Sequence, residues 1–263
     1  MVIRAVFADL DGTTVDTEAR NRRAIEAEAL KGGYKFKPRD WDTLAGQGDG
    51  IIWEKLAQRR PSIKKKFATA ADFVQAVLDG KLARIDEVKK IEETGEALSL
   101  FKNHVEIVAA VSNANEPDAK ASLDKAGYST SDFAFCMFRE DIDRAGLRAK
   151  PYPDPYIEAL RRANEMLAAE AKREHREFIP IKPEECLVLE DSKTGVRAGL
   201  AAGMHVIQMT NETPALDDAE AETFINTHGG TYHPLDRSEL VTRCYTLLGQ
   251  PPVTSPVYAP AIT

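Results

Sequence analysis

Short apolar runs alternate with longer amphipathic segments along most of this chain, and the alternation predicts an α/β protein. The apolar runs have the length and composition of buried strands; they lie at 2–8, 105–111, 133–138, 186–189 and 204–209. Segments with apolar residues at helical spacing lie between or beside them; they include 96–102, 119–126, 155–175 and 196–202. Strands that alternate with helices predict a parallel, doubly wound sheet.

One long block interrupts this alternation. Residues 17–90 are helical in pattern, with no convincing strand, and the segments 62–79 and 82–93 continue that pattern. Because the block follows the first strand directly, we expect it to be an inserted, all-helical domain. The expected division is therefore a core formed by 1–16 and 91–263, with the inserted domain at 17–90.

Composition narrows the class of protein. The chain has 263 residues, a net charge of −7 and three cysteines, Cys136, Cys186 and Cys244. The negative charge argues against nucleic acid as a partner. Because no basic segment precedes a long apolar run, and no apolar run is long enough to span a membrane, we expect neither a signal peptide nor a membrane-spanning segment. Widely spaced cysteines, odd in number, favour free thiols in a reducing compartment. We expect a cytoplasmic protein, a monomer or weak homodimer, with an extended proline-rich arm after Gly249.

The first apolar run ends in acidic and small residues, Asp9-Leu10-Asp11-Gly12-Thr13. Asp9 and Asp11 lie two residues apart, so in an extended chain their side chains project to the same side. Ligands of open α/β sheets bind beyond the carboxyl ends of the strands. Two carboxylates beside a glycine turn favour a Mg²⁺-dependent phosphate site. Taken alone, the stretch also fits a strand with an ordinary Asp-Gly turn.

Polar residues also follow three later strands, at the same edge of the expected sheet. Ser112 ends the second strand, Lys150 follows the third, and Glu190-Asp191 ends the fourth. A hydroxyl and an ammonium suit phosphoryl oxygens, and the helix after Asp191 presents an N-terminus that favours anions. Each position also fits a structural role, as a helix cap or a surface lysine. Their joint occurrence favours a phosphate site.

These segments, taken in order, resemble the four-motif signature of the haloacid dehalogenase-like hydrolases. The motifs are Asp9-Leu10-Asp11-Gly12-Thr13, Ser112-Asn113, Lys150-Pro151 and Glu190-Asp191-Ser192. Residues 150–154 and 189–196 are similar to the β-phosphoglucomutase/phosphatase-like branch. That branch carries a helical cap after the first motif, where the block 17–90 falls. The resemblance therefore implies a Rossmann-like core with an inserted helical cap.

The resemblance implies a role for each acidic residue. Asp9 would be the nucleophile that forms an aspartyl-phosphate, and Asp11 the general acid and then the general base. A Mg²⁺ cofactor would be held by Asp9, Asp191 and the backbone carbonyl of Asp11, with Glu190 ordering a metal-bound water. The phosphate-binding residues that it implies are Gly12, Thr13, Ser112, Asn113 and Lys150.

The function implied is hydrolysis of a small phosphorylated metabolite, such as a sugar phosphate or phosphoglycolate. The alternative is a phosphosugar mutase, but such mutases carry a histidine where this chain has Asn21. They also carry an arginine in the cap loop that here contains Gly46 and Gln47. These three residues are the candidates for substrate contact from the cap. A non-catalytic phosphate-binding regulator is less favoured, because the acidic motif residues are all present.

Overall fold

The computed structural model describes residues 2–44, 47–211 and 213–250. Its centre is a six-stranded sheet with the order β5-β4-β1-β6-β7-β8, in which every neighbouring pair is parallel. The strands are β1 (Ala5–Ala8), β4 (Ile107–Val111), β5 (Cys136–Met137), β6 (Cys186–Glu190), β7 (His205–Met209) and β8 (Thr231–Leu235). The predicted parallel α/β sheet is therefore confirmed. Gly46 and the proline-rich arm beyond residue 250 lie outside the described residues.

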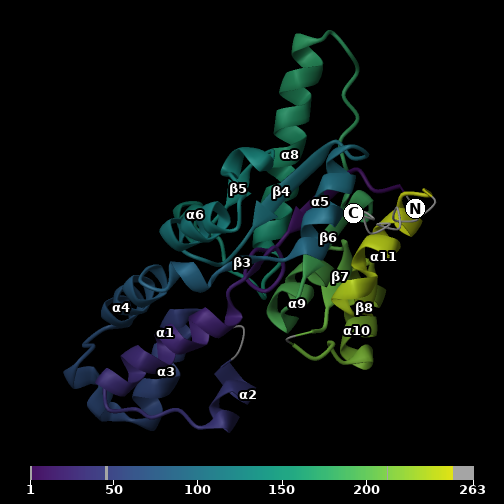
Figure 1. Ribbon diagram of the computed structural model, residues 1–263. Helices are drawn as coiled ribbons and strands as arrows, with labels where there is room; N and C mark the ends of the chain where they lie inside the picture. The colour runs from purple at the N-terminus through teal and green to yellow at the C-terminus, as the bar shows by residue number, and fades with distance from the viewer. Residues whose placement is uncertain (1, 45–46, 212, 251–263) are drawn as a thin grey trace, which may run out of the picture.

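Helices cover both faces of the sheet (Figure 1). Alternate strand residues face opposite sides, so Val6 and Ala8 belong to one apolar core and Ala5 and Phe7 to the other. The first core is covered by α5 (Glu92–Lys102), α6 (Glu116–Lys125) and α11 (Leu240–Leu247). The second is covered by α7 (Arg139–Arg144), α8 (Asp154–Arg173), α9 (Lys193–Ala201) and α10 (Asp218–His228). Both faces of β1 are thus buried, which explains its continuous apolar sequence.

The helices of the inserted block gather beyond one end of the sheet (Figure 1). They are α1 (Glu18–Lys31), α2 (Trp41–Leu44), α3 (Asp49–Arg59) and α4 (Ala70–Leu82). They share an apolar core of their own, in which Ile25, Leu56 and Phe73 are buried. The expected helix at 62–79 is wrong in its first part, because a 3-10 turn at Pro61–Lys65 precedes α4. The side chain of Thr69 accepts from the backbone of Asp72 and starts the helix again.

Two short strands join the block to the core. β2 (Val15–Asp16) pairs in antiparallel fashion with β3 (Lys89–Lys90), so the two connecting segments run side by side. The expectation of helix at 82–93 is therefore wrong at β3, which lies inside the range expected to be all-helical. Two exposed lysines show no strand periodicity in the sequence. The strand β3 forms because these residues pair with β2, a contact that no local pattern predicts.

The cysteines agree with the expectation of free thiols. Cys136, Cys186 and Cys244 are all free thiols. No helix in the described part of the chain has the length and the apolar character needed to cross a membrane.

Candidate active site

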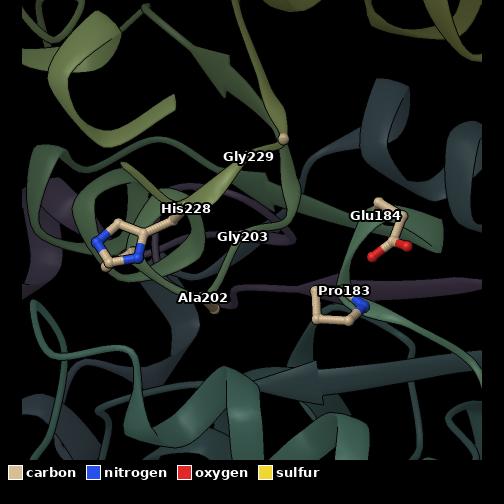
Figure 2. Close-up of a pocket in the computed structure, with 8 residues that line it drawn as sticks. Pro183, Glu184, Ala202, Gly203, His228 and Gly229 are labelled. Carbon is tan, nitrogen blue, oxygen red and sulfur yellow. The ribbon is translucent and has the colours of Figure 1, made fainter. Parts of the chain in front are cut away.

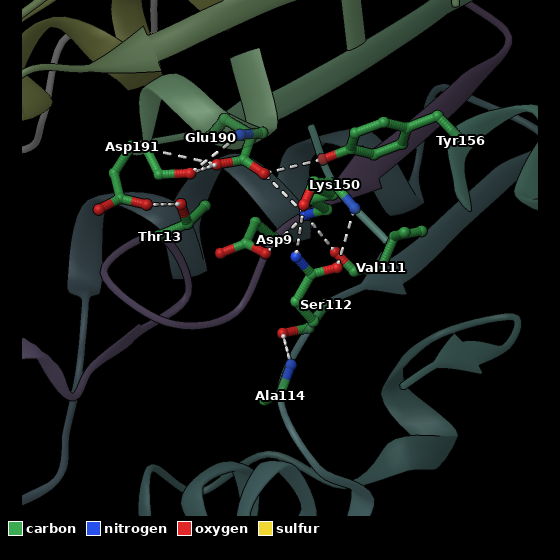
Figure 3. Close-up of polar contacts among 12 residues, drawn as sticks. Asp9, Thr13, Val111, Ser112, Ala114, Lys150, Tyr156, Glu190 and Asp191 are labelled. Carbon is green, nitrogen blue, oxygen red and sulfur yellow. Dashed lines mark hydrogen bonds and ion pairs between the residues drawn. The ribbon is translucent and has the colours of Figure 1, made fainter. Parts of the chain in front are cut away.

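Polar residues from separate strands meet at the carboxyl edge of the sheet (Figure 3). Asp9 follows β1, Ser112 follows β4, and Glu190 ends β6 just before Asp191. The chain turns sharply after β1 at Gly12, whose φ is +76°. A Cβ atom at this glycine would lie only 2.3 Å from Oδ2 of Asp191. Glycine is therefore the residue that lets this turn approach the carboxylate so closely.

Three buried carboxylates form the centre of this cluster. One oxygen each of Asp9, Glu190 and Asp191 lies within 4.8 Å of the others. Asp9 is 8 % exposed, Asp191 3 % and Glu190 0 %. Such a set of convergent carboxylate oxygens is the kind of site that hard cations such as Mg²⁺ prefer.

Lys150 is the cation at the centre of the cluster. Its Nζ lies 2.7 Å from each of three acceptors, Oδ1 of Asp9, Oε1 of Glu190 and the carbonyl oxygen of Val111. Asn113 fixes the backbone of Lys150, because its side-chain amide donates to the Lys150 carbonyl and accepts from the Lys150 N–H, both at 3.2 Å. Both ends of the Asn113 amide are engaged in this way, and the phosphate contact expected of it stays a prediction.

The charges of the cluster do not balance within the protein. Burial and then the nearby charge of Glu190 raise the pKa of Asp9 to about 8, although Lys150 opposes that shift. Burial and the charges of Glu190 and Asp9 raise the pKa of Asp191 as well. Burial works against the charged form of Lys150, but Asp9 and Glu190 raise its pKa well above the ordinary value. The cluster contains one ammonium and three carboxylates, so its residues fit a bound divalent cation.

Glu190 is held by two residues that the sequence analysis did not single out. The buried hydroxyl of Tyr156 on α8 donates to Oε1 of Glu190 at 3.0 Å. A Cβ atom at Gly195, in the first turn of α9, would lie 1.6 Å from the same oxygen, so that helix packs directly on the carboxylate. In the sequence, Tyr156 lies among apolar residues at helical spacing. The one sign of a polar role was its hydroxyl, because a buried tyrosine hydroxyl needs a hydrogen-bond partner.

Two small hydroxyl residues flank the carboxylates. Thr13 Oγ1 donates to Oδ1 of Asp191 at 3.2 Å. Oγ of Ser112 accepts the backbone N–H of Ala114 at 3.1 Å. This contact uses the acceptor side of the Ser112 hydroxyl, and a phosphate oxygen would need only its donor side.

Asp11 faces the inserted block. Its Oδ1 accepts from the hydroxyl of Thr17 and, at 3.3 Å, from Nδ2 of Asn21 on α1. The block thus brings Asn21 to Asp11, and the contact with substrate expected of Asn21 stays a prediction. Gln47 is half-buried just before α3, where its backbone N–H donates to Leu44 at 3.1 Å, and no side-chain contact among the described residues joins it to Asp11.

A separate pocket lies at the opposite end of the strands from the carboxylate cluster (Figure 2). It is lined by Pro183, Glu184, Ala201, Ala202, Gly203, His228, Gly229 and Gly230. These residues precede β6, β7 and β8 or end the helices before them, so the pocket is at the amino ends of the strands. Ligands of doubly wound sheets bind at the carboxyl ends, and we take the carboxylate cluster as the candidate active site.

The sequence is similar to those of known proteins. A family model for haloacid dehalogenase-like hydrolases matches residues 3–203. Protein CbbY of Rhodobacter capsulatus is 24% identical over 233 residues, covering 84% of this chain and 91% of that protein.

Two solved structures have the same fold over nearly their whole length. CbbY from Rhodobacter sphaeroides in complex with phosphate has a TM-score of 0.67 at 20% identity, covering 91% of this chain and 96% of that one. A putative beta-phosphoglucomutase from Thermotoga maritima has a TM-score of 0.62 at 20% identity, covering 93% and 100%. The resemblance seen in the four motifs is confirmed, and this chain belongs to the haloacid dehalogenase-like hydrolases.

Proposed function

We propose that this protein is a Mg²⁺-dependent phosphatase that hydrolyses a small phosphorylated metabolite through an aspartyl-phosphate. The observation that carries the proposal is the position of Asp9, at the end of β1, 2.7 Å from the ammonium of Lys150 and inside a cluster of carboxylates. A phosphoryl group bound there meets a nucleophile and a cation at one point. The phosphate in the similar CbbY structure supports a phosphate site in this family of folds.

The reaction has two displacements at phosphorus. A carboxylate oxygen of Asp9 attacks phosphorus while the bond to the substrate's alcohol oxygen breaks, and Asp11 gives its proton to that oxygen. Asp11 then takes a proton from water as the water oxygen attacks the same phosphorus, which releases inorganic phosphate and regenerates Asp9. Lys150 and Ser112 offset the charge on the phosphoryl oxygens, together with the backbone at Gly12 and Thr13.

The metal would be held by carboxylate oxygens of Asp9 and Asp191 and by the backbone carbonyl of Asp11. Glu190, fixed by Lys150 and Tyr156, would order a metal-bound water. When bound, Mg²⁺ supplies positive charge that offsets the phosphate and the carboxylates.

The block 17–90 is proposed to act as a cap over the site. Asn21 and Thr17 both contact Asp11, so the start of α1 lies against the proposed acid. A site covered in this way would suit a small substrate, such as a sugar phosphate or phosphoglycolate, and would exclude water from the acyl phosphate.

The pairing of two cations in the cap, Lys81 and Arg20, favours a phosphatase over the alternative of a phosphosugar mutase. A mutase needs a second phosphate grip. In the cap, Nζ of Lys81 lies 2.8 Å from Asp49, and the buried Arg20 is paired with Asp118. Each of these two cations is therefore already offset by a carboxylate.

We also place the protein in the cytoplasm, as a monomer or weak homodimer. The free thiols of Cys136, Cys186 and Cys244 support a reducing compartment.

A hydrolysis screen tests the function. Purified protein with Mg²⁺ is expected to release inorganic phosphate from at least one small phosphate monoester, and chelation of the metal is expected to remove that activity. In a matched assay with a sugar phosphate, product analysis is expected to show free sugar and no isomeric sugar phosphate. Isomerisation without release of phosphate would favour the mutase, and binding of phosphate esters without either reaction would favour a non-catalytic regulator.

A further inference from the structure

A fully buried arginine joins the inserted block to the core. Arg20, on the first turn of α1, is 1 % exposed. Its Nη1 lies 2.9 Å from Oδ1 of Asp118 on α6, and its Nη2 donates to Oδ2 of the same carboxylate at 3.2 Å. Nη1 also donates to Ser122, one turn further along α6, at 3.1 Å. The guanidinium therefore holds α1 on α6 through an ion pair with Asp118 and a hydrogen bond to the hydroxyl of Ser122.

The other edge of the same guanidinium is directed at the candidate active site. Nε and Nη2 of Arg20 donate to Oδ1 of Asn21, at 3.2 and 2.8 Å. Because a guanidinium only donates, it fixes the oxygen of the Asn21 amide toward itself. The amide NH₂ then faces the other way, and Nδ2 lies 3.3 Å from Oδ1 of Asp11.

We infer that Arg20 is a positioning residue: the relay Asp118–Arg20–Asn21–Asp11 holds the general acid in place when α1 is docked on α6. The inference rests on the function proposed above. Asn21 has one orientation in the relay, which presents a donor to the Asp11 carboxylate. The second oxygen of Asp11 is thereby directed to one place, where it can meet the leaving oxygen of the substrate.

A purely structural role does not account for this arrangement. A buried ion pair often stabilises a fold no better than apolar residues of similar volume, because both charges lose their hydration. What an apolar pair cannot do is orient an amide. A lysine could keep the charge opposite Asp118, but it lacks the planar fork that holds Asp118 and Asn21 together. The relay thus depends on the planar guanidinium, which can donate to two partners at once in fixed directions.

The test compares Arg20→Lys with the wild-type protein on two kinds of substrate. With an alkyl phosphate, whose leaving group needs a proton, we expect kcat to fall by about 10²-fold while KM stays within about twofold. With an activated aryl phosphate, whose leaving group needs little protonation, the first-turnover burst of aryl alcohol is expected to change by less than about threefold. Arg23→Lys, on the exposed side of the same helix, is the matched control and is expected to leave both rates unchanged.

A second variant keeps the inference testable where Arg20→Lys fails to fold. Asn21→Leu leaves the Arg20–Asp118 pair intact, removes only the amide of the relay, and is expected to show the same split between the two substrates. Wild-type kcat for the alkyl phosphate in the folded variants, or equal losses for both substrates, would overturn the relay. A wild-type protein that hydrolyses no phosphate monoester would instead overturn the proposed function. An active wild-type protein therefore separates the two failures.

Discussion

Asp9→Asn is expected to lower Mg²⁺-dependent phosphate release by about 10⁴-fold or more. The substitution removes the carboxylate that attacks phosphorus and one oxygen of the proposed metal site, while its size and burial hardly change. Steady-state hydrolysis of the best substrate from the screen measures the effect. The predicted loss belongs to kcat, because an amide cannot form the covalent intermediate.

The control for this variant is Asp16→Asn, which makes the same change on an exposed residue of β2. It is expected to retain wild-type kcat and KM. Hydrolysis by Asp9→Asn within tenfold of the wild-type rate would show that the nucleophile lies elsewhere.

Asp191→Asn is expected to remove most of the stabilisation by Mg²⁺ and to stabilise the metal-free protein. If Mg²⁺ binds as proposed, wild-type protein is expected to gain about 2.7 kcal/mol in free energy of unfolding when Mg²⁺ is present at 100 times its Kd. Without metal, Asp191 adds to the repulsion among three buried carboxylates. The asparagine variant is therefore expected to melt at a higher temperature than wild-type protein in chelator and to gain little from Mg²⁺.

The stability of the metal-free protein is expected to depend on pH because of the same buried carboxylates. Because the pKa of Asp9 is raised to about 8 without metal, the folded state keeps a proton that the unfolded state has lost above about pH 4. This group's contribution to the stability of metal-free protein thus falls as pH rises toward 8. The stabilisation by Mg²⁺ is expected to be larger at pH 8 than at pH 5.

Thermal unfolding with and without Mg²⁺, at both pH values, measures these differences. Asp124→Asn, an exposed position on α6, is the control and is expected to follow the wild-type protein. An Asp191→Asn protein that is stabilised by Mg²⁺ as strongly as the wild type would remove Asp191 from the metal site.

The parallel sheet and the polar residues at its edge could be predicted from the sequence because both are encoded locally. The central strands β1, β4 and β6 are mainly apolar runs, and Asp9, Ser112 and Asp191 each come directly after one of them. Parallel strands bring their carboxyl ends to one edge, so the order of elements already places Asp9, Ser112 and Asp191 together.

Other features depend on contacts between distant segments and left little local signal. β8 is an edge strand of partly buried residues, TYHPL, with a proline and no apolar run. β3 exists because Lys89–Lys90 meets β2 in space. Arg20 is one of several charged residues on a polar helix, and its burial is explained by contacts with distant residues of α6, Asp118, 98 residues away, and Ser122. The same is true of Tyr156, which looks like an ordinary core residue until Glu190 is placed beside it.

The most direct test of the proposed mechanism is to find the covalent intermediate. Asp11→Asn keeps Asp9 and the backbone carbonyl proposed as a metal ligand, but it removes the base that prepares water. After brief incubation with an activated aryl phosphate and Mg²⁺, mass spectrometry of this variant is expected to find one phosphoryl group, on Asp9. Asp9→Asn is expected to carry none. A phosphoryl group on any other residue, or rapid turnover with no adduct in Asp11→Asn, would contradict the mechanism.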